Sequence, residues 1–139
     1  MNKLNNHTDL GDVLIRSDLN VPIINNEITD KFRISKSINI INSIYESSRT
    51  ITFTSHLGRP NNSDPNFSLI KIADAMSELL DNEKVMFIDA IHGSKVEEAI
   101  KNQKSKIFLL ENLRFDEGEI NNSLDFAANV TKPFQTYIF

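Results

Sequence analysis

Three short segments of the chain carry side chains suited to binding an anion. They are RSDLN, SHLGRP and ENLRF, and their basic and polar members of interest are Arg16, Asp18, Asn20, His56, Arg59 and Arg114. The planar guanidinium of arginine matches the oxygens of phosphate and carboxylate groups in bidentate fashion. Asp and Asn side chains bond hydroxyl groups. Together, these residue types suit a small ligand that has phosphate, carboxylate and hydroxyl groups.

Arg33 adds a fourth segment to this set. It lies in the first turn of a predicted helix, where the partial positive charge of the helix N-terminus disfavours a cation. A local preference broken without a visible local gain often marks a functional position. An anionic ligand near that turn would attract both the helix end and the guanidinium.

The elements that must position these residues follow from hydrophobic periodicity and turn residues. Predicted strands cover Val13–Val21, Thr50–Thr54, Lys84–Ile88, Lys106–Leu110 and Gln135–Phe139. Predicted helices cover Phe32–Ser48, Leu69–Leu80, Val96–Asn102 and Leu124–Thr131, the first three capped by Asp30, Ser68 and Ser94. Between these elements we expect a turn at 23–28 and loops at 55–66 and 111–122.

Strands and helices that alternate in this way predict an α/β fold: a three-layer, Rossmann-like domain with a mostly parallel sheet and helices on both faces. Ligands of such sheets bind beyond the carboxyl ends of the strands. The anion-binding segments follow the first, second and fourth predicted strands, so we expect them to meet at one edge. Strand alternation would direct Arg16, Asp18 and Asn20 to a single face.

The composition excludes several classes of function. The net charge of −4 is unfavourable for a non-specific grip on nucleic acid or on an anionic membrane. The absence of cysteine excludes disulfides and thiol catalysis. Neither GxGxxG nor GxxxxGK[ST] occurs, and no carboxylate pair is arranged for a metal. A polar start and the lack of a long apolar run predict a cytoplasmic protein.

Plainer interpretations of the same residues stay open at this point. A single surface arginine or loop histidine is usually a solvated side chain, and Arg114 has Glu111, Asp116 and Glu117 as possible partners nearby in sequence. We expect the acidic stretch 116–119 to be a solvated loop. The convergence of several basic residues on one edge favours an anion site over these interpretations.

Four motifs in order resemble the N-terminal domain of the phosphoglycerate kinase family. The family pattern R-V-D-F-N-V-P is matched at Arg16–Pro22 except for two filler residues, and I-T-D-x-x-R-I is matched at Ile28–Ile34. S-H-L-G-R-P is matched at every position of Ser55–Pro60, and L-L-E-N-L-R-F at Leu109–Phe115. The resemblance extends over essentially the whole chain.

This resemblance implies an enzyme of glycolysis that transfers a phosphoryl group reversibly between 1,3-bisphosphoglycerate and ADP, giving 3-phosphoglycerate and ATP. The substrate-binding positions that it implies here are Asp18, Asn20, Arg33, His56, Arg59 and Arg114. Of these, Asp18 and Asn20 would meet the hydroxyl and carboxyl end of the glycerate. The non-transferred phosphate would be held by His56, Arg59 and Arg114.

Arg33 is the residue that the resemblance implies for catalysis, facing the group being transferred. Arg16 would have a supporting role and would order Asp18 and the edge of the sheet. The acceptor carboxylate is already ionised at neutral pH, so no general base is expected.

The resemblance also implies parts that these residues do not supply. Residues 1–139 would be a partial N-terminal, 3-phosphoglycerate-binding domain, and the nucleotide-binding C-terminal domain, which would bind Mg²⁺ with ADP or ATP, would be absent. We therefore expect the chain alone to be inactive, and the full-length enzyme to be a monomer. The alternative is a stand-alone, non-catalytic α/β module that binds a phosphorylated small acid.

Overall fold

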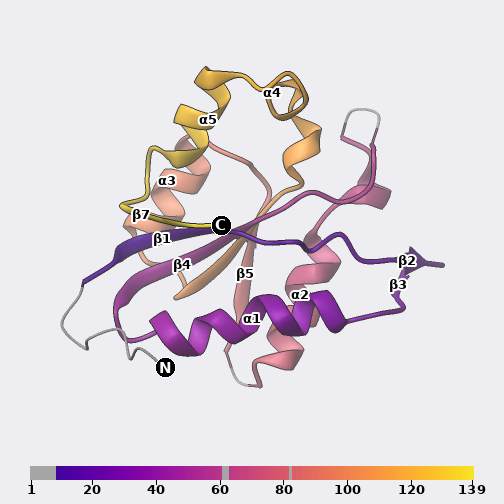
Figure 1. The fold of residues 1–139 in the computed structure, drawn as a ribbon, viewed down its shortest axis with the longest axis horizontal. Coiled ribbons are helices and arrows are strands. Elements are labelled where there is room, and N and C mark those ends of the chain that lie inside the picture. Colours follow the sequence, from indigo (N-terminus) through magenta and orange to yellow (C-terminus); the bar gives the residue numbers. More distant parts are fainter. Residues whose placement is uncertain (1–8, 61–62, 82) are drawn as a thin grey trace.

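The computed structural model describes residues 9–60, 63–81 and 83–139 (Figure 1). Five strands form an all-parallel sheet in the order β5-β6-β4-β1-β7. These strands are β1 (Gly11–Arg16), β4 (Ser48–Thr54), β5 (Val85–Ile88), β6 (Ile107–Leu110) and β7 (Thr136–Ile138). The helices are α1 (Phe32–Ile44), α2 (Ile70–Leu79), α3 (Ser94–Lys101), α4 (Glu117–Ile120) and α5 (Leu124–Thr131).

Helices cover both faces of the sheet, which confirms the predicted three-layer α/β architecture. In Figure 1, α1 and α2 lie on one side of the sheet, and α3, α4 and α5 lie on the other. Among the described residues, no helix has the length and apolar character needed to cross a membrane.

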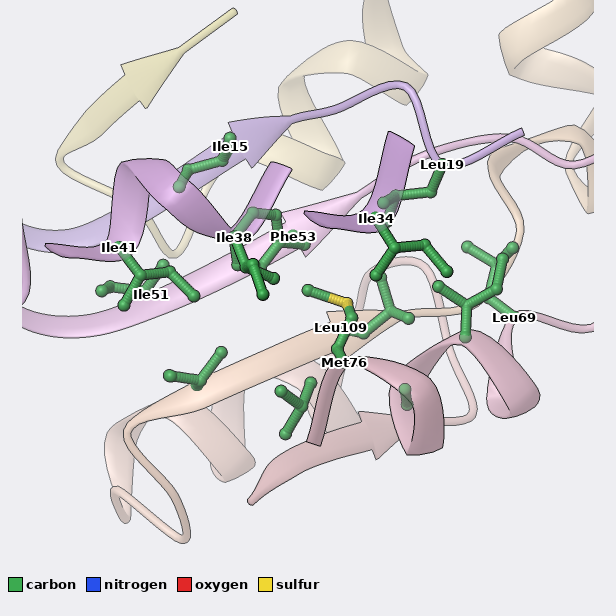
Figure 2. Packing of buried hydrophobic residues seen from close by; sticks show 14 of the residues in the cluster. Ile15, Leu19, Ile34, Ile38, Ile41, Ile51, Phe53, Leu69, Met76 and Leu109 are labelled. Carbon is green, nitrogen blue, oxygen red and sulfur yellow. The ribbon is translucent and has the colours of Figure 1, made fainter. Parts of the chain in front are cut away.

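The core divides into two clusters because successive strand residues point to opposite faces. In β4, Ile51 and Phe53 face α1 and α2, where they meet Ile34, Ile38 and Met76. Figure 2 shows these five side chains together with other buried residues of this cluster. Burial of a continuous apolar layer on each face holds the helices against the sheet.

The second cluster lies on the opposite face, under α3 and α5. Leu14 of β1 and Phe108 of β6 pack there with Val96 of α3 and with Phe126 and Val130 of α5. In β6, Ile107 and Leu109 pack under α1 and α2 while Phe108 and Leu110 pack on the other face, which explains why this strand is continuously apolar. In β4 the alternate positions Thr50, Thr52 and Thr54 are buried but polar.

The first strand is shorter than predicted. β1 ends at Arg16, paired with Thr54, the last residue of β4, and the Ser17 amide donates one further bond to the Thr54 carbonyl oxygen at 3.1 Å. The following residues turn, with the Leu19 amide donating to the Ser55 hydroxyl at 3.0 Å. Asp18 and Asn20 therefore lie beyond the strand, although exposed Asp18 and half-buried Asn20 still alternate with buried Leu19 and Val21, the pattern that the sequence predicted.

The predicted turn at 23–28 contains a small antiparallel hairpin of β2 (Ile23–Ile24) and β3 (Glu27–Ile28). Asn25 and Asn26 both have positive φ, which is the conformation of a tight hairpin turn that asparagine tolerates well. This hairpin projects away from the sheet at the right of Figure 1 and leads into α1.

Helix boundaries differ from the predictions by a few residues. α1 ends at Ile44, because residues 45–47 turn and Ser48 already begins β4. Asp30 and Ser68 accept a bond from the first helical amides, although each lies one position before the boundary residue. Ser94 is the first residue of α3 rather than its cap.

Both long loops contain helical turns that were not predicted. The loop at 55–66 includes the 3-10 turn η1 (Pro65–Phe67), while its residues 61–62 lie outside the described residues. The loop at 111–122 includes the 3-10 turn η2 (Leu113–Phe115) and α4. Asn112 and Asp116 start these two turns by accepting from the amides of Arg114 and Gly118. The acidic stretch 116–119 is therefore largely helical, and its prediction as a solvated loop was wrong.

We expect Phe53→Ala to lower the free energy of unfolding by about 3–5 kcal/mol, because it leaves a cavity between the sheet and α1. Phe53 is 0% exposed, whereas Phe32 is 64% exposed. Phe32→Ala is the matched control and should cost less than about 1 kcal/mol, mainly its contact with Lys36. Urea unfolding followed by circular dichroism measures both, and equal losses would contradict the assigned core.

Candidate functional site

The loops after β1, β4 and β6 begin side by side. β4 lies between β1 and β6 in the sheet, with Arg16 paired to Thr54 and Phe53 paired to Leu109. Since all three strands are parallel, their carboxyl ends share one edge. The loops that carry the residues singled out in the sequence therefore leave the sheet from neighbouring points, as predicted.

The first loop forms a direct cluster with the start of α1. The Arg33 guanidinium donates from Nη1 to the Asn20 carbonyl oxygen at 2.7 Å and to Asp18 Oδ1 at 3.3 Å. Asp18 Oδ1 also accepts from the Asn20 amide at 3.2 Å. Arg33 and Asp18 are 52% and 63% exposed, so their ion pair positions the side chains and adds little stability.

This contact corrects one step of the sequence argument. Arg33 does break the charge preference of a helix N-terminus, but the Asp18 carboxylate beside it offsets that cost. Arg33 thus has a partner that is close in space although it lies 15 residues away in sequence.

The second loop is tied to the first through Gly58. Its amide donates to Asn20 Oδ1 at 3.1 Å. Gly58 has φ of +60°, and a Cβ atom there would lie 2.5 Å from the Phe67 ring. Only glycine fits this position, because both the backbone conformation and the aromatic neighbour exclude a side chain.

The third loop closes on the same glycine. Arg114 donates from Nη1 to the Gly58 carbonyl oxygen at 2.6 Å. Arg59, Pro60, Arg114 and Glu119 line an open pocket of about 430 Å³. None of the carboxylates named as alternative partners of Arg114 forms an ion pair with it among the described residues.

His56 is half-buried beside this pocket. Burial lowers the pKa of its imidazole below the ordinary value, and the positive charges of Arg114 and Arg16 lower it further. The carboxylates of Asp18 and Glu119 act in the opposite direction with smaller effects. The imidazole is therefore neutral near pH 7, and an anion bound next to it would favour the protonated form.

The supporting role expected for Arg16, ordering Asp18, is not seen in its contacts. Arg16 pairs with Glu119, with Arg16 Nη2 2.6 Å from Glu119 Oε1. The Glu119 side chain is 17% exposed and that of Arg16 45% exposed, and this ion pair links the end of β1 to α4. Asp18 pairs with Arg33 instead.

The six candidate residues therefore form two neighbouring groups. Asp18, Asn20 and Arg33 are in direct contact, and the charge of Asp18 acts on His56. In the second group, Arg59 and Arg114 line the pocket, and His56 lies near enough to Arg114 for that charge to lower its pKa in addition to burial, the larger cause. Asn20 connects the groups through Gly58. Within the described residues, we find no contact that links Arg33 directly to the pocket arginines.

This arrangement is suited to binding rather than to proton transfer. The exposed Arg59 and the half-buried Arg114 line one pocket together with Glu119, which is paired with Arg16, and the His56 imidazole lies near Arg114. Among the described residues, no group of three His, Cys, Asp or Glu side chains can hold a metal ion.

Comparison with known proteins decides the family. A sequence model described as phosphoglycerate kinase matches residues 5–139. The chain belongs to the phosphoglycerate kinase family. Curated relatives include a phosphoglycerate kinase from Wolbachia sp. subsp. Drosophila simulans (strain wRi), 42% identical over 127 residues. Another, from Thermosipho africanus (strain TCF52B), is 43% identical over 117 residues.

Solved phosphoglycerate kinases have the same fold. The structure from Pyrococcus horikoshii OT3 matches 99% of this chain with a TM-score of 0.80 at 28% identity. The structure from Coxiella burnetii matches 96% of this chain with a TM-score of 0.74 at 29% identity. The match covers 36% and 33% of those two chains. The matches to the Wolbachia and Thermosipho proteins cover 91% and 83% of this chain. They cover only 32% and 29% of the length of those two relatives, so this chain spans about a third of a curated phosphoglycerate kinase.

Sequence reasoning missed the polar residues that hold the phosphoglycerate kinase loops together. Ser55 accepts from the first loop, Asn112 bonds the second, and Glu119 pairs with Arg16. Asn112 lies inside the LLENLRF motif beside Arg114, and that position was the available signal. For Glu119 no local signal existed, because its partner is 103 residues away.

We expect the His56 imidazole to titrate below pH 6.5. Because the folded state favours the neutral form, stability is fully present above pH 6.5 and falls as the pH drops towards the lower folded pKa. Arg114→Gln should raise the His56 pKa without restoring the ordinary value, since burial is the larger cause. Proton NMR of the imidazole measures the midpoint.

Lys132→Gln is the matched control, because it removes the same charge from a position next to Asp12 and Arg49 at the amino edge of the sheet. It should leave the His56 midpoint unchanged. A His56 midpoint at or above 6.5 in the unmodified protein would contradict the electrostatics described here.

Proposed function

We propose that this chain forms the 3-phosphoglycerate-binding part of a phosphoglycerate kinase. The reaction would be reversible phosphoryl transfer between 1,3-bisphosphoglycerate and ADP, giving 3-phosphoglycerate and ATP. The observation that carries this proposal is the meeting of the three motif loops at the carboxyl edge of the sheet, joined at Gly58. Family membership supports the reaction class.

The pocket lined by Arg59 and Arg114 is our candidate for the phosphate that is not transferred. Two guanidinium groups supply bidentate donors there, and His56 supplies a third group that gains a proton more readily once an anion is bound. Phosphate recognition by positive groups in this open pocket requires no movement of a proton between residues.

Asp18 and Asn20 would meet the hydroxyl and carboxyl end of the glycerate. Both lie beside Arg33, which we propose as the catalytic residue that faces the transferring phosphoryl group. We assign the two ends of the ligand to different residues because the candidate residues form two separate groups, one around Arg33 and the other at the pocket. A ligand that spans both would have its phosphate at one end and its reacting carboxyl at the other.

Arg33 would act through charge. During phosphoryl transfer, negative charge is spread over the oxygens of the transferring group, and a positioned arginine stabilises it. The acceptor oxygen belongs to a carboxylate that is ionised at neutral pH, so a general base is not required. Rate acceleration would then come from positioning and electrostatics.

The nucleotide, bound with Mg²⁺, would be held by residues outside this chain. Support comes from the relatives, which are about three times as long as this chain, and from the lack of a nucleotide fingerprint in its sequence. Mg²⁺ would supply charge neutralisation between the phosphate oxygens of the nucleotide. We place the full-length enzyme in the cytoplasm, as a monomer.

We expect the full-length gene product to bind 3-phosphoglycerate, and Arg59→Ala to weaken binding about 10- to 100-fold through loss of a charged hydrogen bond. Isothermal titration calorimetry measures the dissociation constants. Lys71→Ala is the matched control, because Lys71 lies on α2 and contacts Asn26 away from the pocket. An Arg59→Ala affinity equal to that of the control would refute the assigned phosphate site.

We also expect the 139-residue chain to produce no ATP-dependent phosphorylation of 3-phosphoglycerate, because a nucleotide site is needed to present the γ-phosphate. A coupled assay with the purified chain measures turnover against a reaction without protein. Turnover that rises with the concentration of the chain would show that these residues contain the complete active site.

A further inference from the structure

Asn112 is a fully buried polar side chain at the start of the loop after β6. It is 0% exposed. Its Oδ1 atom accepts from the amides of Leu57 and Arg114, at 3.2 and 3.0 Å. Its Nδ2 atom donates to the carbonyl oxygens of Leu57 and Phe67, at 2.8 and 2.9 Å. A carboxamide has two donor hydrogens and two acceptor lone pairs, and Asn112 uses all four.

These four bonds join the two loops that form the pocket. Asn112 bonds both the amide and the carbonyl of Leu57, as a neighbouring strand would, and Leu57 lies between His56 and Gly58. The same Oδ1 atom holds the backbone amide of Arg114. One side chain therefore sets the distance between the backbone that carries His56 and Arg59 and the backbone that carries Arg114.

Neighbouring contacts hold Asn112 itself in place. The Asn112 amide donates to Glu111 Oε1 at 2.7 Å, and that oxygen also accepts from the Leu69 amide at 2.9 Å. The Leu113 amide donates to the Ser55 carbonyl oxygen at 3.0 Å. Glu111 is 7% exposed. Asn112 is thus held by hydrogen bonds of the same buried segment, and it is the residue that joins the two loops.

An apolar residue at position 112 would fill the same volume but would leave the amide and the carbonyl of Leu57 without the partners they have here. Unpaired buried backbone groups are costly, so the loop would move to satisfy them. Such movement would separate the pocket residues from one another. Misplacement of binding groups by about 1 Å can lower activity on the order of 100-fold.

We infer that Asn112 is a positioning residue for anion recognition, one that does not touch the ligand but sets the spacing of His56, Arg59 and Arg114. This inference rests on the proposed function, because the ligand is the phosphate of a small phosphorylated acid. It goes beyond that function by assigning the affinity of the pocket partly to a buried amide.

Asn112→Asp tests the inference. The substitution keeps the shape and the Oδ1 acceptor, but it places a carboxylate oxygen opposite the carbonyl oxygens of Leu57 and Phe67 in place of a donor. We expect the dissociation constant for 3-phosphoglycerate to rise at least about tenfold. The KM for 3-phosphoglycerate of the full-length gene product should rise as well, whereas the KM for ATP should stay within about twofold, because no nucleotide group contacts this loop in the proposal.

Thr50→Val is the matched control. Thr50 is also 0% exposed, and its hydroxyl donates to Asp12 at 2.7 Å at the other edge of the sheet. It should lower the melting temperature without changing the dissociation constant. If Asn112→Asp folds and binds like the unmodified protein, or if both variants weaken binding to the same extent, the inference is wrong.

Amide hydrogen exchange in the unmodified protein decides the case if Asn112→Asp does not fold. The amides of Leu57 and Arg114 should then exchange as slowly as those of core residues such as Phe53. Exchange that is orders of magnitude faster would overturn the inference. Failure of the unmodified protein to bind 3-phosphoglycerate would refute the proposed function, whereas normal binding with an unaffected Asn112→Asp variant would refute only the positioning role.

Discussion

The geometry of the candidate site depends on the peptide groups on either side of Gly58. The loop after β1 holds the Gly58 amide through Asn20, and the loop after β6 holds the Gly58 carbonyl through Arg114. A parallel sheet brings three loops to one edge, but it leaves the loops free to diverge beyond that edge. These two hydrogen bonds remove that freedom, and they require a residue without a side chain because of the Phe67 ring.

The scaffold beneath the site is apolar and divided by the sheet. One cluster packs under α1 and α2, and the other packs under α3 and α5. At the carboxyl edge this pattern changes, since Ser55, Glu111 and Asn112 are buried polar residues with hydrogen-bonded partners. Hydrophobic burial supplies stability without direction, whereas buried hydrogen bonds impose defined distances. The chain thus uses apolar packing to form the sheet and polar contacts to arrange its edge.

Charge is distributed unevenly across the site. Arg16 and Arg33 are each paired with a carboxylate, whereas Arg59 and Arg114 take part in no ion pair among the described residues. Unpaired positive charge therefore lies at the pocket, and the Arg114 charge adds to burial, the larger cause, in lowering the pKa of His56. In a chain with a net charge of −4, this unpaired charge gives an anion a specific place to bind without making the whole surface attractive to polyanions.

The sequence by itself determined the fold class, the family and the edge of the sheet from which the three motif loops leave. Alternating apolar strands and amphipathic helices allow few topologies, and parallel strands place their carboxyl ends together. The tertiary structure alone decided how the residues of those loops are arranged. The end of β1 at Arg16, the pairing of Asp18 with Arg33, the helical turn that carries Glu119 and the four bonds of Asn112 were not predicted. The Asp18–Arg33 pair, the bonds of Asn112 to Leu57 and the Arg16–Glu119 pair join residues 15 to 103 positions apart, and local propensity carries no information about such contacts.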